Sequence, residues 1–506
     1  MRKIFILLCV IICANTYAQD FGFGFDDAAG DTASESPVSV KVSGEIAVEL
    51  LPFIYDFKKK DDAQTISFWD MVSGKLNFTV SGGNIEGFAA LNLNANAVSE
   101  LWNVSPLLDD PAYTPLIFDE AFLRAYIGPV NIEAGLRKLS WGKADSFGPL
   151  DVINPIDYSD LTNITDIKAS KIARPMIHVS WGMDDGFSKL EAVFIPNFSG
   201  HRFAQEGRWA PSQFTNMPSN IERGIFSRAG ERHGTIVSML GFDTIFGGVQ
   251  NNLMTYFNNN PISAPPSGGL DYFQTGLRYT TTIGPADIGA QYFYGNLFRP
   301  GFTIGGVDSF LDDLVTNVTG GNLAYPGEAE LLAPQLKYNR YHQIGIDYAQ
   351  VLLGLNIRSE FAVHLTEDMK GDDGAVRNPF IGWSLGFDRD VFRGVNVNIQ
   401  GNETIRLFDS KVGDNPVLDC EADTSVTSTR LTLRLSKKFL KDELECKLTG
   451  IWGIEDKDGY IIPALVWSIG DMSAELSAGV FLGEKSGELG QYRENSFIKL
   501  GLKYTF

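Results

Sequence analysis

The sequence has few cysteines and histidines, and beyond its first residues it has no long apolar run. It contains four cysteines and five histidines among 506 residues. Cys9 and Cys13 lie at the amino terminus, which leaves Cys420 and Cys446, too few for a disulfide framework. None of the histidines lies in a metal-ligand spacing such as HExxH. We therefore expect no catalytic or metal site, no cofactor and no enzyme, although a barrel hydrolase assembled from distant residues stays open.

Basic residues are also in deficit. The chain has 42 Lys and Arg against 62 Asp and Glu. The stretch "MRKIFILLCVIICANTYAQD" reads as a signal peptide over residues 1–18, with an apolar run too short to span a membrane. A lipoprotein cut before Cys13 is disfavoured by the bulky Ile12. Loss of Arg2 and Lys3 leaves 40 basic and 62 acidic residues, a formal net charge of −22. Such an acidic exported chain is a poor candidate to bind nucleic acid.

The remaining chain repeats one pattern. Residues 19–37 are acidic and rich in Gly, Ser and Ala, which predicts a flexible leader. From Val38 onward, pairs of alternating segments meet at short turns, such as Gly128-Pro129 and Gly284-Pro285, and long polar loops separate the pairs. Apolar side chains occupy one face of each segment, as in Val395–Ile399, and the opposite face carries residues such as Asn398 and Gln400. Apolar-out and polar-in hairpins predict an all-β fold, a closed antiparallel transmembrane β-barrel over residues 38–506.

Counting the alternating segments predicts about 16–20 strands, an even number, with poorly defined segments at 222–257. Aromatic residues fall near the predicted strand ends, where they suit the membrane interface. Glu403 breaks the pattern because it falls in the outward register. Cys420 and Cys446 are expected to stay unpaired, since most of a strand separates them, on the order of 20 Å at ~3.3 Å per residue.

The carboxyl terminus alternates strictly and ends on an aromatic residue. Its apolar positions are Ile498, Leu500, Leu502, Tyr504 and Phe506. This ending, together with the signal peptide and the hairpins, resembles Gram-negative outer-membrane porins. The resemblance implies an outer-membrane location in contact with lipid, and it implies that these five residues are the signal read by the barrel-assembly machinery.

The most unusual loop runs between strands predicted to end near Leu139 and to resume near Arg174. It is long and less polar than an exposed loop, so we expect residues 140–173 to fold into the lumen; an ordinary outer loop with its own small cluster is the alternative. Its residues Arg137, Trp141-Gly142 and Ile153-Asn154-Pro155 are similar to a loop in a poorly characterised family of large proteobacterial outer-membrane proteins. In that family Glu usually stands at the position of Lys143. The similarity implies a channel or assembly role.

Charges on the loop and the neighbouring strands predict a pore constriction. Opposed basic and acidic rows at a narrow point set the selectivity of a pore. In the alternative, Arg–Asp pairs simply hold the loop to the wall. The predicted constriction residues are Arg124, Glu133, Arg137, Lys143, Asp145, Asp151, Asp157, Asp160, Arg174 and His178.

The sequence therefore predicts a porin-like channel for small hydrophilic solutes. Two alternatives remain: a surface adhesin or ligand-binding barrel, which would use the long loops at 198–232, 298–336 and 409–424, and a substrate-specific transporter of hydrophobic compounds or polysaccharide. The acidic net charge favours cations, whereas the basic row favours anions locally. The solute, the oligomeric state and whether the lumen is open stay undetermined by sequence.

Overall fold

The computed structural model describes residues 38–55, 72–94, 118–204, 207–212, 217–241, 268–321, 333–414, 419–422 and 424–506, with residues 253, 255, 256, 259 and 331. The predicted signal peptide and acidic leader lie outside the described residues. Within these ranges, no helix is both long and apolar enough to cross a bilayer.

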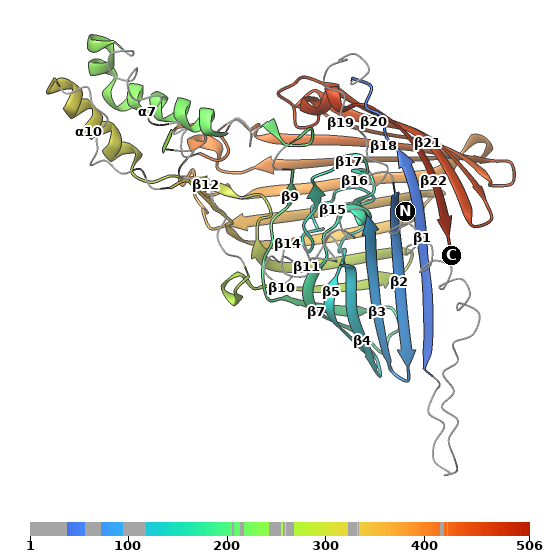
Figure 1. Ribbon diagram of the computed structural model, residues 1–506. Helices are drawn as coiled ribbons and strands as arrows, with labels where there is room; N and C mark the ends of the chain where they lie inside the picture. Colours follow the sequence, from blue (N-terminus) through green and yellow to red (C-terminus); the bar gives the residue numbers. More distant parts are fainter. Residues whose placement is uncertain are drawn as a thin grey trace, which may run out of the picture.

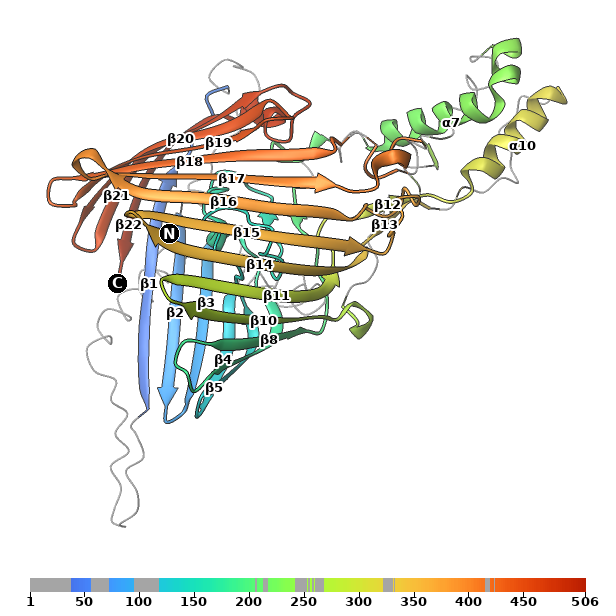
Figure 2. The ribbon, with the colours of Figure 1, turned by 180° about the vertical axis from the view of Figure 1, so that it is seen from behind.

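Eighteen antiparallel strands form one closed sheet, which confirms the predicted β-barrel and its even strand number (Figures 1 and 2). Each strand pairs with the next, and β1 also pairs with β22 to close the ring. In ring order the strands are β1 (Ser39–Leu50), β2 (Val72–Gly82), β3 (Ile85–Asn94), β4 (Phe118–Ile127), β5 (Val130–Arg137), β7 (Arg174–Gly182), β8 (Lys189–Ile195), β10 (Gln274–Ile283), β11 (Ala286–Asn296), β14 (Arg340–Leu352), β15 (Leu355–Thr366), β16 (Phe380–Val391), β17 (Val395–Arg406), β18 (Thr427–Phe439), β19 (Leu444–Gly453), β20 (Asp458–Ile469), β21 (Met472–Gly483) and β22 (Phe497–Thr505).

The two ends of the barrel differ. Short turns join strands at the end where β1 begins and β22 finishes, which we call the short-turn end. Gly128 and Gly284 adopt φ values of +58° and +61° in two of these turns, a conformation that favours glycine. Most connections at the opposite end, the long-loop end, are long. This is the asymmetry predicted from the sequence, and outer-membrane barrels have it too.

The two faces of the wall follow the predicted alternation. Outward positions carry exposed apolar side chains, including Leu277 and Ile346. Inward positions carry polar groups that the barrel contents cover, such as Gln343 and Gln400, which are 0% and 1% exposed. A wall with an apolar outer surface and a polar inner surface suits a bilayer outside and water or polar protein inside.

Shorter elements lie in the loops. They comprise the strand pairs β6 (Asp157–Tyr158) with β9 (Arg202–Phe203) and β12 (Gly301–Thr303) with β13 (Gln335–Lys337), the helices α5 (Ile167–Ser170), α7 (Met217–Leu240) and α10 (Val307–Thr319), and the 3-10 turns η2 (Leu270–Tyr272), η3 (Phe392–Gly394), η4 (Asp409–Lys411) and η5 (Gly490–Asn495).

Helices α7 and α10 lie side by side beyond the long-loop end (Figures 1 and 2). The segments at 222–257, which are poorly defined in the sequence, add no strand to the wall in the part described, because α7 occupies most of it. Ile221, Ile225 and Ala229 recur every fourth residue and pack against Phe310 and Leu314 of α10. This spacing is a helical signal that predicts a buried stripe.

Two apolar clusters fill space inside the ring. The first includes Trp141 and Ile153 of the inward loop and Phe293 of β11. The second joins Leu161 of the loop to Tyr460 and Phe481 on the far strands. Residues of the 138–173 segment thus pack against opposite parts of the wall, as the low polarity of the loop led us to expect.

Strand β22 has the predicted alternation. Ile498, Leu500 and Leu502 are exposed on the outer surface, and Lys499 points inward to pair with Glu49 at 2.8 Å. Phe506 and Gly44 exchange backbone hydrogen bonds of 2.8 and 2.9 Å. The carboxyl terminus therefore forms part of the seam that closes the barrel.

Two further sequence observations gain a structural account. Glu403 on the outer face accepts a hydrogen bond of 2.6 Å from the indole of Trp383, its partner across the ladder. Cys420 lies in the β17–β18 loop, whereas Cys446 lies on β19 opposite Lys437, near the short-turn end. Both thiols are free. The hairpin assignment behind the unpaired-thiol prediction is therefore confirmed.

Candidate functional site

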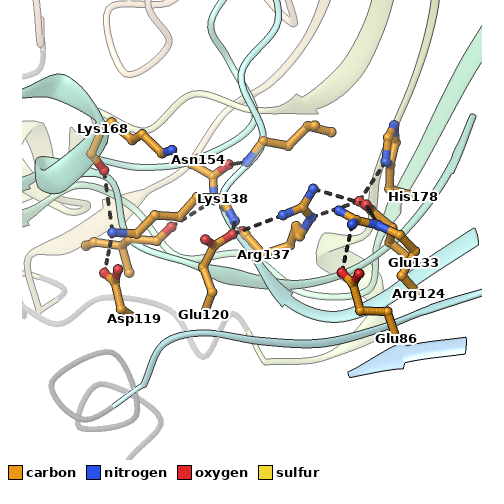
Figure 3. A network of polar contacts seen from close by, with 12 residues as sticks. Glu86, Asp119, Glu120, Arg124, Glu133, Arg137, Lys138, Asn154, Lys168 and His178 are labelled. Carbon is orange, nitrogen blue, oxygen red and sulfur yellow. Dashed lines mark hydrogen bonds and ion pairs between the residues drawn. The ribbon is translucent and has the colours of Figure 1, made fainter. Parts of the chain in front are cut away.

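A network of ion pairs covers the inner wall from β3 to β8, and Figure 3 shows its part from Glu86 on β3 to His178 on β7. Glu133 on β5 accepts from Arg124 Nε at 2.6 Å and from Arg137 Nε at 2.8 Å. Its carboxylate also contacts His178 Nδ1 at 3.1 Å, and His178 Nε2 lies 3.2 Å from Glu191. Arg124 further donates to Glu86 at 2.9 Å. These residues meet because they occupy cross-strand positions on one face of the sheet.

The root of the inward loop is fixed to the same wall. Lys138 binds Asp119 at 2.5 Å, and its backbone N–H donates to Glu120 at 2.8 Å. Asn154 then joins the two ends of the loop: its oxygen accepts from Leu139 N at 2.8 Å, and its amide donates to the carbonyls of Arg137 and Ile172 at 2.9 and 2.8 Å (Figure 3 labels Asn154). Asn154 is 2% exposed, so all three bonds form away from bulk water.

The Trp141-Gly142 step has an equally clear role. Trp141 is buried in the first apolar cluster. Gly142 has a φ of +102°, and a Cβ atom built there would lie 2.3 Å from Glu360 Oε1. The position therefore needs glycine both for its backbone conformation and for close contact with the opposite wall.

The tip of the loop is bonded to strands across the lumen. Glu360 on β15 accepts from the backbone N–H groups of Lys143, Ala144 and Leu150. The further wall contacts are Gln400 with Asp145 N and Ser146 N at 2.8 and 3.1 Å, Arg434 with the carbonyl of Asp145 at 2.9 Å, Gln291 with the carbonyl of Leu150 at 2.9 Å, and Gln343 with the carbonyl of Pro149 at 2.6 Å.

These anchors span the barrel. In a ring of 18 strands, β18, which carries Arg434, is the ninth strand after β5, half of the way round. Cavities of about 500 and 460 Å³ adjoin the loop, and Ser140 and Gly142 line both. The first also reaches Arg434, and the second reaches His178. The 140–144 segment therefore separates two polar cavities.

The structure does not pair the predicted basic row with the loop acids. Arg124 and Arg137 bind carboxylates of the wall, as described above. Asp145 pairs with Arg358 of the far wall, Asp151 with Lys171 of the loop at 2.6 Å, and Asp157 with Arg202. The three remaining residues have other partners. Asp160 accepts a hydrogen bond from Thr162 N at 2.8 Å, and Lys143 lies 3.6 Å from Asp287. Arg174 is 1% exposed and donates to the carbonyls of Ile153 and Asn197 at 3.3 and 2.6 Å.

A second segment helps to hold the loop. His201 Nδ1 accepts from Ile156 N at 2.9 Å, and β9 pairs with β6 of the loop. Burial, followed by the nearby positive charge of Arg299, lowers the pKa of His201 to about 3, so the ring is neutral near pH 7. Burial alone would raise the pKa of Asp157, but the hydrogen bond and ion pair with Arg202 lower it overall.

Sequence reasoning did not identify the far-wall anchors Glu360, Gln400 and Arg434. Glu360 and Gln400 belong to the inward polar rows that alternation reveals. Their loop partners lie more than 200 residues away in the chain, with separations such as 217 and 255. No local pattern encodes such a pairing; only the closure of the ring brings these residues to the loop.

The histidines do not assemble with one another. His233 binds Asp312 at 2.9 Å on the α7–α10 pair, His342 binds the Tyr292 hydroxyl at 2.7 Å, and His364 stacks on Phe380. Gly382–Gly386 matches the GxSxG pattern, but it lies inside strand β16 instead of at a strand-to-helix turn. In the part of the chain that the structure describes, no group of three or more His, Cys, Asp or Glu residues could hold a metal.

No protein-family model and no curated protein matches the chain, so the likeness of the loop to a proteobacterial family is not confirmed. Solved structures give three instructive likenesses. A BenF-like porin from Pseudomonas fluorescens Pf-5 is 8% identical, with a TM-score of 0.44, covering 93% of this chain and 98% of that one. A porin refined at 1.8 Å resolution is 11% identical, with a TM-score of 0.37, covering 92% and 100%. The outer membrane channel DcaP of Acinetobacter baumannii is 7% identical, with a TM-score of 0.37, covering 93% and 97%. TM-scores below 0.5 establish no more than a likeness.

Proposed function

We propose that the protein is an outer-membrane channel for small hydrophilic solutes, with residues 140–173 as its constriction. One observation carries the proposal: a loop bonded to both sides of a polar-lined barrel crosses the lumen without filling the cavities beside it. The exposed apolar side chains on the outer face support a membrane location. Barrels of 16–18 strands are wide enough to enclose an aqueous path.

The constriction residues divide by their contacts. Arg124, Glu133, Arg137 and His178 line or adjoin the cavity beside β5–β10, with Lys143 on the loop side. Asp145 and Asp151 border the other cavity. Asp157, Asp160 and Arg174 make contacts that hold the loop in shape. We infer that the first two groups meet passing solute and that the third positions the loop.

Planar-bilayer recording of the purified, folded chain tests the proposal. We expect ion-conducting channels, and we expect Lys143→Glu to shift the reversal potential in a salt gradient towards cations. Lys457→Glu is the matched control, because it makes the same charge change on an exposed turn outside the wall strands. Well-folded protein without conductance would contradict the channel, and equal shifts in both variants would contradict the constriction.

A ligand-binding barrel is the second candidate, and α7 and α10 favour it. The pair projects beyond the long-loop end with its own apolar core and with ion pairs such as Arg232–Asp312 at 2.7 Å (Figures 1 and 2). A preformed projecting unit suits recognition of an external ligand. Deletion of residues 217–240 together with residues 307–319 keeps the wall strands β10 and β11 in place. It should leave conductance intact if the protein is a channel, and should abolish ligand or cell binding if it is an adhesin.

A further inference from the structure

Three arginines from separate parts of the chain converge near the long-loop end. Arg299 follows β11, Arg377 precedes β16, and Arg430 points inward from β18. Glu488 of the β21–β22 loop binds Arg299 through one carboxylate oxygen at 2.5 Å and Arg430 through the other, and the charge of Arg377 also acts on this carboxylate. One carboxylate therefore bridges guanidinium groups that the fold brings from different sides of the ring.

The surroundings of this bridge differ from those of an ordinary surface ion pair. The side chains of Arg299 and Glu488 are 45% and 43% exposed, so small solutes can reach them. The charge of Arg299 lowers the pKa of Glu488 to about 2, and Glu488 in turn raises the pKa of Arg299. The carboxylate therefore stays ionised at any physiological pH, as a bound anion would.

Arg377 is the least neutralised member of the group. Among the described residues, its nearest carboxylate is Glu421, at 3.8 Å. Burial lowers the pKa of Arg377, and the positive charge of Arg299 lowers it further. The Arg377 side chain is 25% exposed, and a guanidinium that experiences the charge of a second one would gain from an additional anion.

The backbone beside Glu488 is held independently of its side chain. The buried carboxylate of Asp458 accepts from the N–H groups of Leu489 and Gly490, the latter at 3.0 Å. The Glu488 side chain can therefore rotate away from the arginines while the loop keeps its position. This arrangement makes Glu488 a tethered carboxylate that a free anion can replace.

We propose that Arg299, Arg377 and Arg430 form a binding site for small solutes carrying a carboxylate or phosphate group, and that Glu488 occupies the site when no solute is bound. Guanidinium groups bind both anions through paired hydrogen bonds. The acidic net charge of the chain by itself repels anions near the barrel mouth, and the positive charge of the three arginines offsets this repulsion locally. A role in solute uptake rests on the proposed channel; the binding itself does not.

Calorimetric titration of the folded, full-length chain in detergent at low salt tests the site. Succinate and inorganic phosphate are the two probes, and succinamide is the uncharged control. Glu488→Gln removes the carboxylate that competes with a free anion for the arginines. Because the effective concentration of that tethered carboxylate is on the order of millimolar or above, the substitution should tighten anion binding at least about tenfold. Glu494→Gln is the matched variant, because it removes a carboxylate of the same loop that pairs with Lys485 at 3.0 Å. It should leave affinity within about twofold.

Adding Arg377→Gln to the Glu488→Gln chain should weaken binding by about tenfold or more. The tighter of the two probes identifies the anion class. The proposal is overturned if neither anion binds Glu488→Gln, if Glu494→Gln tightens binding equally, or if Arg377→Gln has no effect. Because binding in detergent does not require conduction, a chain that binds anions but does not conduct would contradict the channel alone.

Discussion

Glu360→Ala should release the tip of the inward loop. Glu360 is 4% exposed and accepts hydrogen bonds from three backbone N–H groups of the loop. Its removal leaves these donors without their partner inside the barrel. We take the cost of leaving each donor unpaired as about 1 kcal/mol, the low end of the usual range, because water in the lumen can reach part of the site. The bonded state of the loop then loses about 3 kcal/mol. Since 1.4 kcal/mol corresponds to a tenfold change, the released population should rise about a hundredfold.

Cysteine labelling measures this release. In a chain with Cys420→Ser and Cys446→Ser, a single Ser146→Cys reports on the tip, because Ser146 is buried beside Gln400. We expect the labelling rate by a small water-soluble thiol reagent to rise about a hundredfold with Glu360→Ala. Glu360→Gln should have a smaller effect, since its amide oxygen can still accept from two of the three donors.

Ser384→Ala is the control, because Ser384 faces Glu360 across the β15–β16 ladder and is equally buried. It should leave the labelling rate unchanged. Equal labelling of the Glu360→Ala and Glu360 chains, with both barrels folded, would refute the reasoning that this carboxylate holds the loop across the lumen.

Four further outcomes are expected. Asn154→Leu, which removes three buried hydrogen bonds at the loop root, should destabilise the loop by about 2–4 kcal/mol and increase current noise in bilayers; an unchanged noise spectrum would contradict this. Gly44→Val should lower the folded, heat-modifiable fraction in gels, because a Cβ atom at this position would lie 2.8 Å from the ring of Phe506. Gly450→Val is the control and should fold normally, because a Cβ atom there would have no neighbour within 4 Å. The pKa of His201 in the folded state, about 3, lies below its usual 6.5. The contribution of His201 to stability should therefore be complete above pH 6.5 and should fall as the pH drops from 6.5 towards 3. A melting temperature with the same pH dependence in His201→Phe would contradict this. Reversal potentials in a salt gradient should favour cations, given the formal net charge of −20 of the sequence, and a preference for anions would show that local arginines dominate.

The wall was predictable because strand alternation is a local signal. The outward row at Leu431, Leu433 and Leu435 and the carboxyl-terminal row from Ile498 both follow from a period of two residues. The low polarity of the loop also predicted that it packs inside. Helix α7 was not predicted, although Ile221 and Ile225 have helical spacing, because the segment was poorly defined as strand and lies partly in the predicted loop 198–232.

The bonding partners of the loop were not predictable from sequence. Asn154 was noticed as part of a motif, but its role depends on the carbonyls of Arg137 and Ile172 lying within reach of one amide. That geometry exists only after β5 and β7 have paired. The wider lesson is that alternation predicts the face on which a side chain lies, while ring closure decides which residues it meets.

In the proposed channel, the pairings also change which residues can control selectivity. Arg124 and Arg137 share the carboxylate of Glu133, and they also pair with Glu86 and Glu120 at 2.9 and 3.4 Å. Opposite charges this close largely cancel beyond the length of the pairs. A solute passing at a distance of several ångströms therefore meets a weak field from these arginines. Lys143, 3.6 Å from Asp287 and 30% exposed on the loop, keeps more of its charge available to solute. We infer that a single lysine on the crossing loop has more influence on selectivity than the arginine row of the wall.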